Sequence, residues 1–363
     1  MEAKYKQRNS NLELYRILVM LSILAHHYIV HSSLINYMAE EPFSLNTISL
    51  NIIGMWGKIG INCFVFITGY FMCTSEITIK KFVKLLFEIE FYYIIINTIF
   101  LIFGNEKPTF TSVIYGYFPI EIFSYNFIGS YMVFYLFIPF LNILINGLNK
   151  KKHLQLILLC LTIYTVLGSI PQILITINYI TWFSVLYLIS SYIRIWGFPY
   201  KISNHQWGIL TIISLFFSMA SVIIILYLSH KIKLYIPSDY FVSDSNKIFA
   251  LTTSFCSFMF FNGLKIKQNK FINTIASSTF GVLLIHDQSV AMRNFLWNII
   301  CQNSYVINTY PHLILIHACL CILCIYTVCI IIDRFRIKYI ETPVLNYFEI
   351  FVKQKKRTKN ALD

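Results

Sequence analysis

The chain has 363 residues, of which 57% are hydrophobic and only 12% are charged. A soluble domain usually has roughly 25% charged residues, so this chain has too few to cover a surface that faces water. Its mean hydropathy of +0.65 agrees, and an ordinary soluble domain is excluded. The net charge of +13 comes from lysines and arginines clustered between apolar runs. Because this pattern is typical of membrane topology, we expect no nucleic-acid partner.

Long apolar runs recur from one end of the chain to the other. Crossing a bilayer takes about 20 residues of helix, and only helices or closed barrels satisfy their backbone hydrogen bonds in lipid. The runs do not alternate, which excludes a barrel and predicts an all-α, polytopic membrane protein. No small-residue cleavage site follows the first run, so we expect it to remain as the first helix. We predict about ten transmembrane helices, over residues 12–32, 50–73, 82–103, 127–146, 155–171, 179–197, 207–229, 247–263, 274–290 and 311–332.

The lysines and arginines predict how these helices are oriented. With the N-terminus placed in the cytoplasm, 22 of the 29 lie in inner segments and 5 in outer segments, and Arg16 and Lys58 fall within spans. Cytoplasmic loops are rich in positive charge, so this distribution places both termini in the cytoplasm. We expect one membrane domain over residues 1–350 and a basic cytoplasmic tail over residues 351–363.

Most of the nine cysteines lie inside apolar runs. Cys321 and Cys324 form a C-x-x-C pair, but they lie in a predicted membrane helix with no second pair nearby. Packing explains them better than a metal or redox site does. We therefore predict neither a disulfide framework nor a metal site.

The first predicted helix has ionisable residues at membrane depth, where such residues are costly and usually face the protein interior. Arg16 and His27 lie on one helix face, because at about 100° per residue they are separated by three turns, or about 16 Å. His31 continues this face. Arg16 is alternatively a helix-end residue whose side chain reaches the interface. His27 lies deeper, and is either a neutral histidine bonded to a neighbouring helix or a general base in a polar cavity.

The second predicted helix is rich in glycine and holds the polar side chains Lys58, Asn62 and Thr68. Small residues at this spacing favour close helix packing over contact with a ligand. Lys58 lies near the middle of the span, so it needs a partner or a cavity.

The ninth predicted helix ends in polar side chains. It includes His286 and Asp287, and Arg293 follows it. In the predicted orientation these residues lie near the outer face. The His–Asp pair is there either as ordinary interfacial polarity or as part of a functional site.

Four segments of the chain form a recognisable set. They are Arg16 with ten residues before His27, preceded by Asn11-Leu12-Glu13; Gly60 to Phe71; Tyr187 to Arg194; and Ser278 to Val282 with Ile285-His286-Asp287. The set resembles the integral-membrane acyltransferases that include bacterial polysaccharide O-acetyltransferases, often called acyltransferase family three. The resemblance spans most of the chain. Departures are Thr68 and Ser190, where the family usually has serine and glycine, and Lys81 and Lys84, where several members have arginine.

This resemblance implies transfer of an acyl group, usually acetyl, from cytoplasmic acyl-CoA to a sugar hydroxyl, often at the outer face. Acyl-CoA is then a donor substrate and not a permanently bound cofactor. His27 is implied as the leading catalytic residue, and Arg16 as a contact on the CoA side. Lys81 and Lys84 are implied to lie near the CoA phosphates, although lysine is a weaker bidentate phosphate ligand than arginine.

Acyl transfer to a hydroxyl needs a base, donors for the developing oxyanion and a site for the anionic donor. His27 can take the alcohol proton, with His286 and Asp287 as candidate catalytic partners. In an alternative scheme, a histidine is itself acylated and relays the group across the membrane. The candidates for oxyanion or substrate contacts are Lys58, Asn62, Thr68 and Arg293.

Two other classes of protein remain open. A secondary transporter or flippase also has many helices with buried charge, but the paired broken helices of a transporter are not visible in the sequence. A non-catalytic membrane sensor is the other class, and the intact Arg16 and His27 argue against it. The composition, rich in isoleucine, asparagine, lysine and tyrosine, suggests an AT-rich bacterial genome. We therefore expect a bacterial cell-membrane protein that contacts lipid, is compatible with a homo-oligomer, and acts on a capsule-type glycan or a glycolipid.

Overall fold

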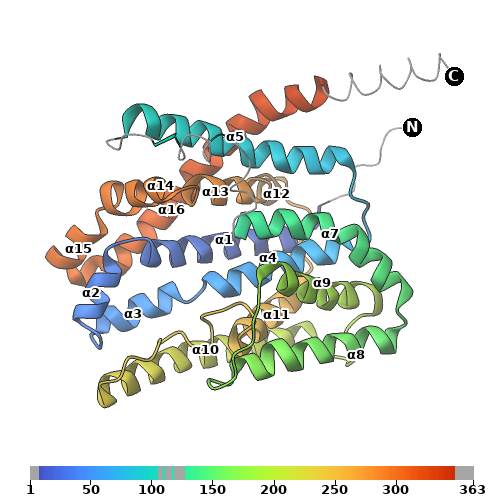
Figure 1. Cartoon of the computed structure of the whole chain (residues 1–363), viewed down its shortest axis with the longest axis horizontal. Coiled ribbons are helices and arrows are strands. Elements are labelled where there is room, and N and C mark those ends of the chain that lie inside the picture. The colour runs from blue at the N-terminus through green and yellow to red at the C-terminus, as the bar shows by residue number, and fades with distance from the viewer. Residues whose placement is uncertain (1–7, 105–108, 111–116, 118–126, 348–363) are drawn as a thin grey trace.

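The structure of the protein is a computed structural model that describes residues 8–104, 109–110, 117 and 127–347. All regular structure in these ranges is helical, which confirms the all-α prediction. Most of the long helices lie side by side with their axes in roughly one direction (Figure 1). The predicted basic tail over residues 351–363 lies outside the described residues.

Seven segments among the described residues are long and apolar enough to cross a membrane, as expected of a multi-pass membrane protein. Each overlaps one of the predicted spans. The segments are Ser10–Val30 (α1), Leu45–Met72 (α3, Leu45–Gly54, and α4, Gly57–Met72), Ile79–Phe103 (α5), Phe127–Gly147 (α7), Lys150–Ser169 (α8, Lys150–Cys160, then η2, Leu161–Val166, and η3, Leu167–Ser169), Asn204–Ile232 (α10) and Pro311–Tyr347 (η5, Pro311–Leu313, then α16, Ile314–Arg336, and η6, Ile337–Glu341).

The other three predicted spans are helices of a different kind. The span at 179–197 is α9 (Tyr179–Trp196), whose side chains are mostly buried in the bundle, so it needs less apolar surface than a lipid-facing helix. The span at 247–263 is α11 (Ile248–Gly263), a shorter apolar helix. The span at 274–290 is broken, because α12 (Lys270–Ala276) ends before α13 (Thr279–His286) begins. The number ten therefore stays a prediction.

Several helices begin at a polar residue that satisfies the free backbone N–H groups of the first turn. Ser44 and Thr78 accept hydrogen bonds from backbone amides in the first turns of α3 and α5. Ser203 forms a full capping box with Gln206 at the start of α10. These local signals fix where the helices start, and packing between them fixes the bundle.

Helix α1 lies at the centre of the bundle and packs against α3, α4, α11, α12, α13 and α16. Its contact with α4 depends on glycine, because a Cβ atom on Gly57 would lie 2.4 Å from the ring of His26. Likewise, a Cβ on Gly69 would lie 2.1 Å from the hydroxyl of Ser190 on α9. The close approach of these helices confirms that glycines of the second predicted span serve packing.

Short helices gather at the end of the bundle where α1 ends and α16 begins (Figure 1). Because they join the long helices, they hold the ends of α1 and α13 in place. They are α2 (Leu34–Glu40), α14 (Val290–Asn294), η4 (Phe295–Ile300) and α15 (Asn303–Thr309).

Candidate active site

Two histidines from opposite ends of the chain meet inside the bundle. His27 on α1 and His286 at the end of α13 are 259 residues apart, yet His27 Nδ1 lies 2.8 Å from His286 Nε2. The other ring nitrogen of His286, Nδ1, lies 2.6 Å from the carbonyl oxygen of Val282. His286 is fully buried, so both of its ring nitrogens are used within the protein.

This chain of hydrogen bonds determines where the protons of the two neutral rings lie. The carbonyl of Val282 only accepts, so the proton of His286 sits on Nδ1 and its Nε2 is an acceptor. His27 then donates from Nδ1 to that acceptor. The lone pair of His27 is therefore on Nε2, the nitrogen that is not in this chain. A backbone carbonyl, acting through His286, thus fixes the orientation and the tautomer of the His27 ring.

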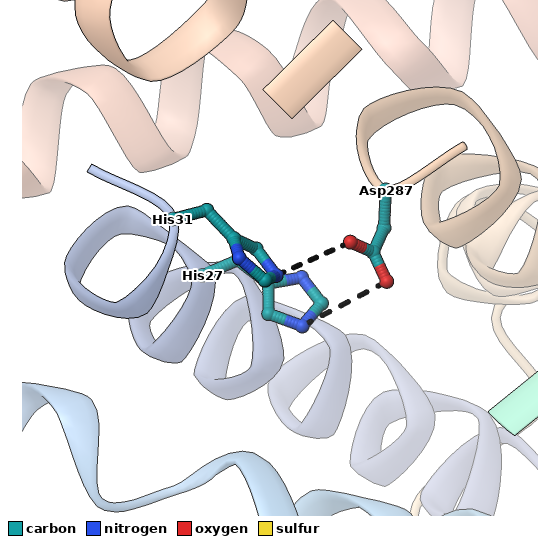
Figure 2. A group of neighbouring side chains, drawn as sticks. All are labelled: His27, His31 and Asp287. Atoms are coloured by element: carbon teal, nitrogen blue, oxygen red, sulfur yellow. Dashed lines mark ion pairs between the residues drawn. The ribbon is translucent and has the colours of Figure 1, made fainter. Parts of the chain in front are cut away.

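Asp287 follows His286 and gathers three groups that can carry positive charge. Its carboxylate oxygens lie 4.0 Å from His27 Nε2, 3.3 Å from His31 Nε2 and 3.5 Å from Arg293 Nε. Figure 2 shows the side chains of His27 and His31 pointing from one face of α1 toward this carboxylate. A proton taken up by His27 would be stabilised by the negative charge of Asp287.

The predicted residues His27, His286, Asp287 and Arg293 thus lie together. His31 was predicted only to share the face of His27, and its contact with Asp287 adds it to the cluster. His27, His31 and Asp287 offer ligand atoms within 4.8 Å of one another, a set that can hold a divalent metal. The guanidinium of Arg293 already faces the same carboxylate, and a second cation there would be repelled.

Arg16 lies further along the same face of α1, toward its N-terminal end. Its guanidinium forms an ion pair with Glu13, with Nη1 and Oε2 3.1 Å apart, and its side chain is 24% exposed. Glu13 lies 3.8 Å from Arg8 as well. Arg16 is therefore held by a carboxylate but still open on one side, which is compatible with contact to an anionic ligand.

The two lysines at the start of α5 differ in their surroundings. Lys81 is exposed, and its ammonium donates to the backbone carbonyl of Glu76 at 2.6 Å. Lys84 is paired with the carboxylate of Glu341, with Nζ and Oε1 2.8 Å apart. Lys81 is therefore the freer cation of the two.

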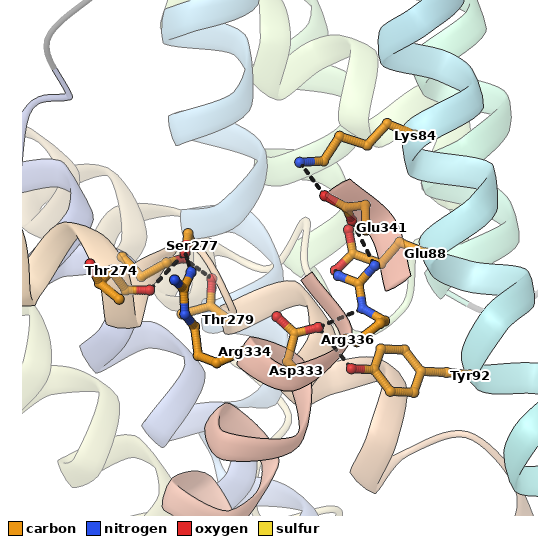
Figure 3. A network of polar contacts seen from close by, with 11 residues as sticks. Lys84, Glu88, Tyr92, Thr274, Ser277, Thr279, Asp333, Arg334, Arg336 and Glu341 are labelled. Atoms are coloured by element: carbon orange, nitrogen blue, oxygen red, sulfur yellow. Dashed lines mark hydrogen bonds and ion pairs between the residues drawn. The ribbon is translucent and has the colours of Figure 1, made fainter. Parts of the chain in front are cut away.

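Glu341 belongs to a buried charge network that the sequence analysis missed (Figure 3). The guanidinium of Arg336 contacts Glu341 at 2.6 Å, Asp333 at 2.9 Å and Glu88 at 3.0 Å. Tyr92 donates to Asp333 at 2.8 Å. The spacing of Asp333 and Arg336 by three residues was a usable signal, but the predicted span ended at residue 332, just before it. The network joins α5, α16 and η6.

The three polar residues of α4 that were predicted as oxyanion or substrate contacts each bind different partners within the protein. Lys58 donates to the hydroxyl of Tyr179, and its Nζ lies 5.0 Å from the centre of that ring. Asn62 donates to the carbonyl of Ser245 at 2.7 Å and accepts from the indole of Trp182 at 2.9 Å.

Thr68 completes the set. It donates to the carbonyl of Phe64 at 3.0 Å and lies 3.2 Å from the hydroxyl of Tyr131. The structure therefore gives Lys58, Asn62 and Thr68 partners within the bundle. Of the four predicted oxyanion or substrate contacts, Arg293 is the one that joins the cluster around Asp287.

A family model described as an acyltransferase domain, Acyl_transf_3, matches residues 9–339. No curated protein and no solved structure matches the chain. The match covers nearly the whole chain, including α1, which holds His27, and α13, which holds His286. The chain therefore belongs to acyltransferase family three and is a membrane acyltransferase.

Proposed function

We propose that this acyltransferase moves an acetyl group from cytoplasmic acetyl-CoA to a hydroxyl of a surface polysaccharide, with His27 as the general base. The observation that supports this most directly is the hydrogen-bond chain from the carbonyl of Val282 through His286 to His27. This chain leaves Nε2 of His27 unprotonated, with a free lone pair that can accept the proton of the hydroxyl group in acyl transfer.

In the proposed reaction, one nitrogen atom first takes a proton and then passes it on. Nε2 of His27 takes the proton of the acceptor hydroxyl, and the hydroxyl oxygen bonds to the thioester carbon. The carbon–sulfur bond then breaks, and the same proton passes from Nε2 to the CoA sulfur, which leaves as a thiol. Asp287, 4.0 Å from Nε2, stabilises the imidazolium between these steps, and His286 keeps the ring in place.

The donor fits along the shared face of Arg16 and His27. These residues are separated by about 16 Å along the axis of α1, a distance that suits an extended pantetheine arm. We place the phosphates of CoA near Arg16 and Lys81, which offer a guanidinium and an exposed ammonium. The thioester then reaches His27, and the acceptor approaches from the end of the bundle that holds Arg293.

The test of this function is transfer of label from [14C]acetyl-CoA. Membranes with and without the chain are incubated with the labelled donor and the surface polysaccharide of the source cells. We expect alkali-labile label on the polymer only where the chain is present. A secondary transporter would leave the polymer unlabelled, and that result would exclude the proposal.

Replacing His286 tests the orienting role of its ring. We expect His286→Leu to lower kcat about 10–100-fold, because His27 loses the acceptor that fixes its tautomer. Removing a residue that orients a functional imidazole commonly has an effect of this size. The KM for acetyl-CoA should change less than twofold. His286→Gln should recover part of the rate, since its side-chain oxygen accepts from Nδ1 of His27. Equal kcat values for the two variants would mean that the ring only fills space.

Replacing the two lysines of α5 should have different effects, one on donor binding and the other on stability. Lys81→Ala is expected to raise the KM for acetyl-CoA about tenfold, because a charged hydrogen bond to phosphate contributes about 1.5 kcal/mol or more. Lys84→Ala should leave that KM nearly unchanged and lower the thermal midpoint slightly, because its partner is Glu341. Initial rates against donor concentration decide between them, and the reverse order would make Lys84 the phosphate contact.

A further inference from the structure

A cavity of about 460 Å³ lies beside the His27 cluster, in the same end of the bundle. Parts of α1, α2, α3, α10 and residues 235–239 form its walls. Its volume falls in the range of about 300–1,000 Å³ that is usual for small-ligand sites. Neither His286 nor Asp287 lines it, so it is separate from the cluster around Asp287.

The walls of this cavity combine apolar and polar surface. The aliphatic side chains of Ile29 and Leu50 face it. Asp239 also lines it, and its half-buried carboxylate has no hydrogen bond or ion pair among the described residues. Ser238 donates to the side chain of Asn51 at 2.7 Å on the same wall. Tyr235, which is 87% exposed, stands at the margin.

This mixture matches the chemistry of a sugar ring. A carboxylate accepts hydrogen bonds from hydroxyl groups, and a charged acceptor makes them about twice as strong as neutral ones. Aliphatic and aromatic side chains cover the C–H faces of the ring. A hydrocarbon chain, by contrast, would leave the carboxylate of Asp239 without a partner at an apolar surface.

His26 connects the cavity to the catalytic histidine. Its ring lines the cavity, donates a hydrogen bond from Nδ1 to the carbonyl of Gly54, and has room only because residue 57 is glycine. The ring centres of His26 and His27 are 5.5 Å apart. A molecule in the cavity is therefore next to the site of acyl transfer without occupying it.

We propose that this cavity is a subsite for one sugar unit of a polymeric acceptor, next to the unit whose hydroxyl faces His27. The inference rests on the proposed function, because it requires a glycan as the acceptor. Binding a neighbouring unit uses remote contacts to hold the reacting hydroxyl near the base. Enzymes gain both rate and selectivity in this way, so the cavity selects among glycans.

Filling the cavity tests the subsite. Ala39 is an exposed residue of α2 that lines the cavity, so Ala39→Trp narrows it without disturbing the core. Asn36→Trp, on the same short helix but outside the lining, is the matched control. Asp239→Asn removes the free carboxylate, and Glu41→Gln is the matched control for charge.

The experiment measures ester content of the surface polysaccharide in source cells that express each variant, and acetyl-CoA affinity of each purified variant by calorimetry. We expect Ala39→Trp to lower the ester content at least tenfold and Asp239→Asn to lower it several-fold. Both controls should stay within twofold of the wild type. Acetyl-CoA affinity should stay within twofold in all four variants.

Two results would overturn the subsite. The first is wild-type ester content in Ala39→Trp, and loss of a co-purified phospholipid from that variant would then make the cavity a lipid site. The second is a joint loss of ester and acetyl-CoA affinity, since the cavity would then not act on the acceptor alone. Absence of ester even with the wild-type chain would instead reject the proposed function, and the subsite with it.

Discussion

His27→Ala is expected to lower kcat for acetyl transfer by about 10²–10⁴, the usual contribution of a positioned general base. Alanine leaves no group at the position of Nε2 to take the hydroxyl proton. Of the two neighbouring imidazoles, His286 has both ring nitrogens in the orienting chain, and His31 is held at the carboxylate of Asp287. The KM for acetyl-CoA should change little, because the site proposed for the CoA phosphates is near Arg16, away from His27. Initial rates with saturating donor and polysaccharide measure the effect.

The matched control is His205→Ala, an exposed histidine at the start of α10 and outside the cluster. It should keep wild-type kinetics. Thermal unfolding in detergent should show that His27→Ala retains its fold. His27 is partly exposed, and its side chain contacts only His286 and Asp287 by hydrogen bond or ion pair among the described residues. A folded His27→Ala protein with a wild-type rate would remove the base from the mechanism.

The shared face of Arg16 and His27 on α1 could be predicted because it depends on local geometry. The helical repeat alone places Arg16 and His27 on one side. The family resemblance then pointed to His286 and Asp287, which the structure brings to His27. The orienting chain could not be predicted, because it depends on a contact between segments 259 residues apart and on the carbonyl of Val282. Spacing along the sequence does not contain that information.

Polarity at membrane depth was a weaker guide. Asn62 was predicted as a candidate oxyanion contact, but its donor and acceptor are both used by Ser245 and Trp182. A buried amide between packed helices is as stable when it joins them as when it faces a ligand. The sequence cannot separate these cases, since the difference lies in what the neighbouring helices present.

The last helix continues past its predicted boundary. The predicted span ends at residue 332, whereas α16 continues to Arg336. The helix continues since Asp333 pairs with Arg336, which also pairs with Glu88 on α5. The same pairing explains Lys84, which was predicted near CoA and is held by Glu341. Charges that neutralise one another can stay buried, but their partners are visible only in the fold.

Arg336 forms more ion pairs than any other side chain in this network. Its guanidinium is 2% exposed and contacts three carboxylates, those of Glu88, Asp333 and Glu341. Removing one partner of a buried charge group leaves the others uncompensated, at a cost of about 3–5 kcal/mol. Without Arg336, Lys84 would be the remaining cation among the described residues that forms an ion pair with one of these carboxylates. Its partner is Glu341, so Glu88 and Asp333 would have no such ion pair.

Arg336→Met should therefore lower the free energy of unfolding by about 3–5 kcal/mol, as measured by denaturant unfolding in detergent micelles. Arg334→Met is the matched control, because Arg334 is half-buried and donates to the hydroxyl of Ser277 at 3.3 Å. It should cost less than about 1 kcal/mol. Adding Asp333→Asn and Glu88→Gln to Arg336→Met should restore part of the loss, since fewer negative charges then remain buried. If Arg336→Met proves as stable as the wild type, the network contributes nothing to holding α5 on α16, and α13, which packs against both, must be held in place by apolar contacts instead.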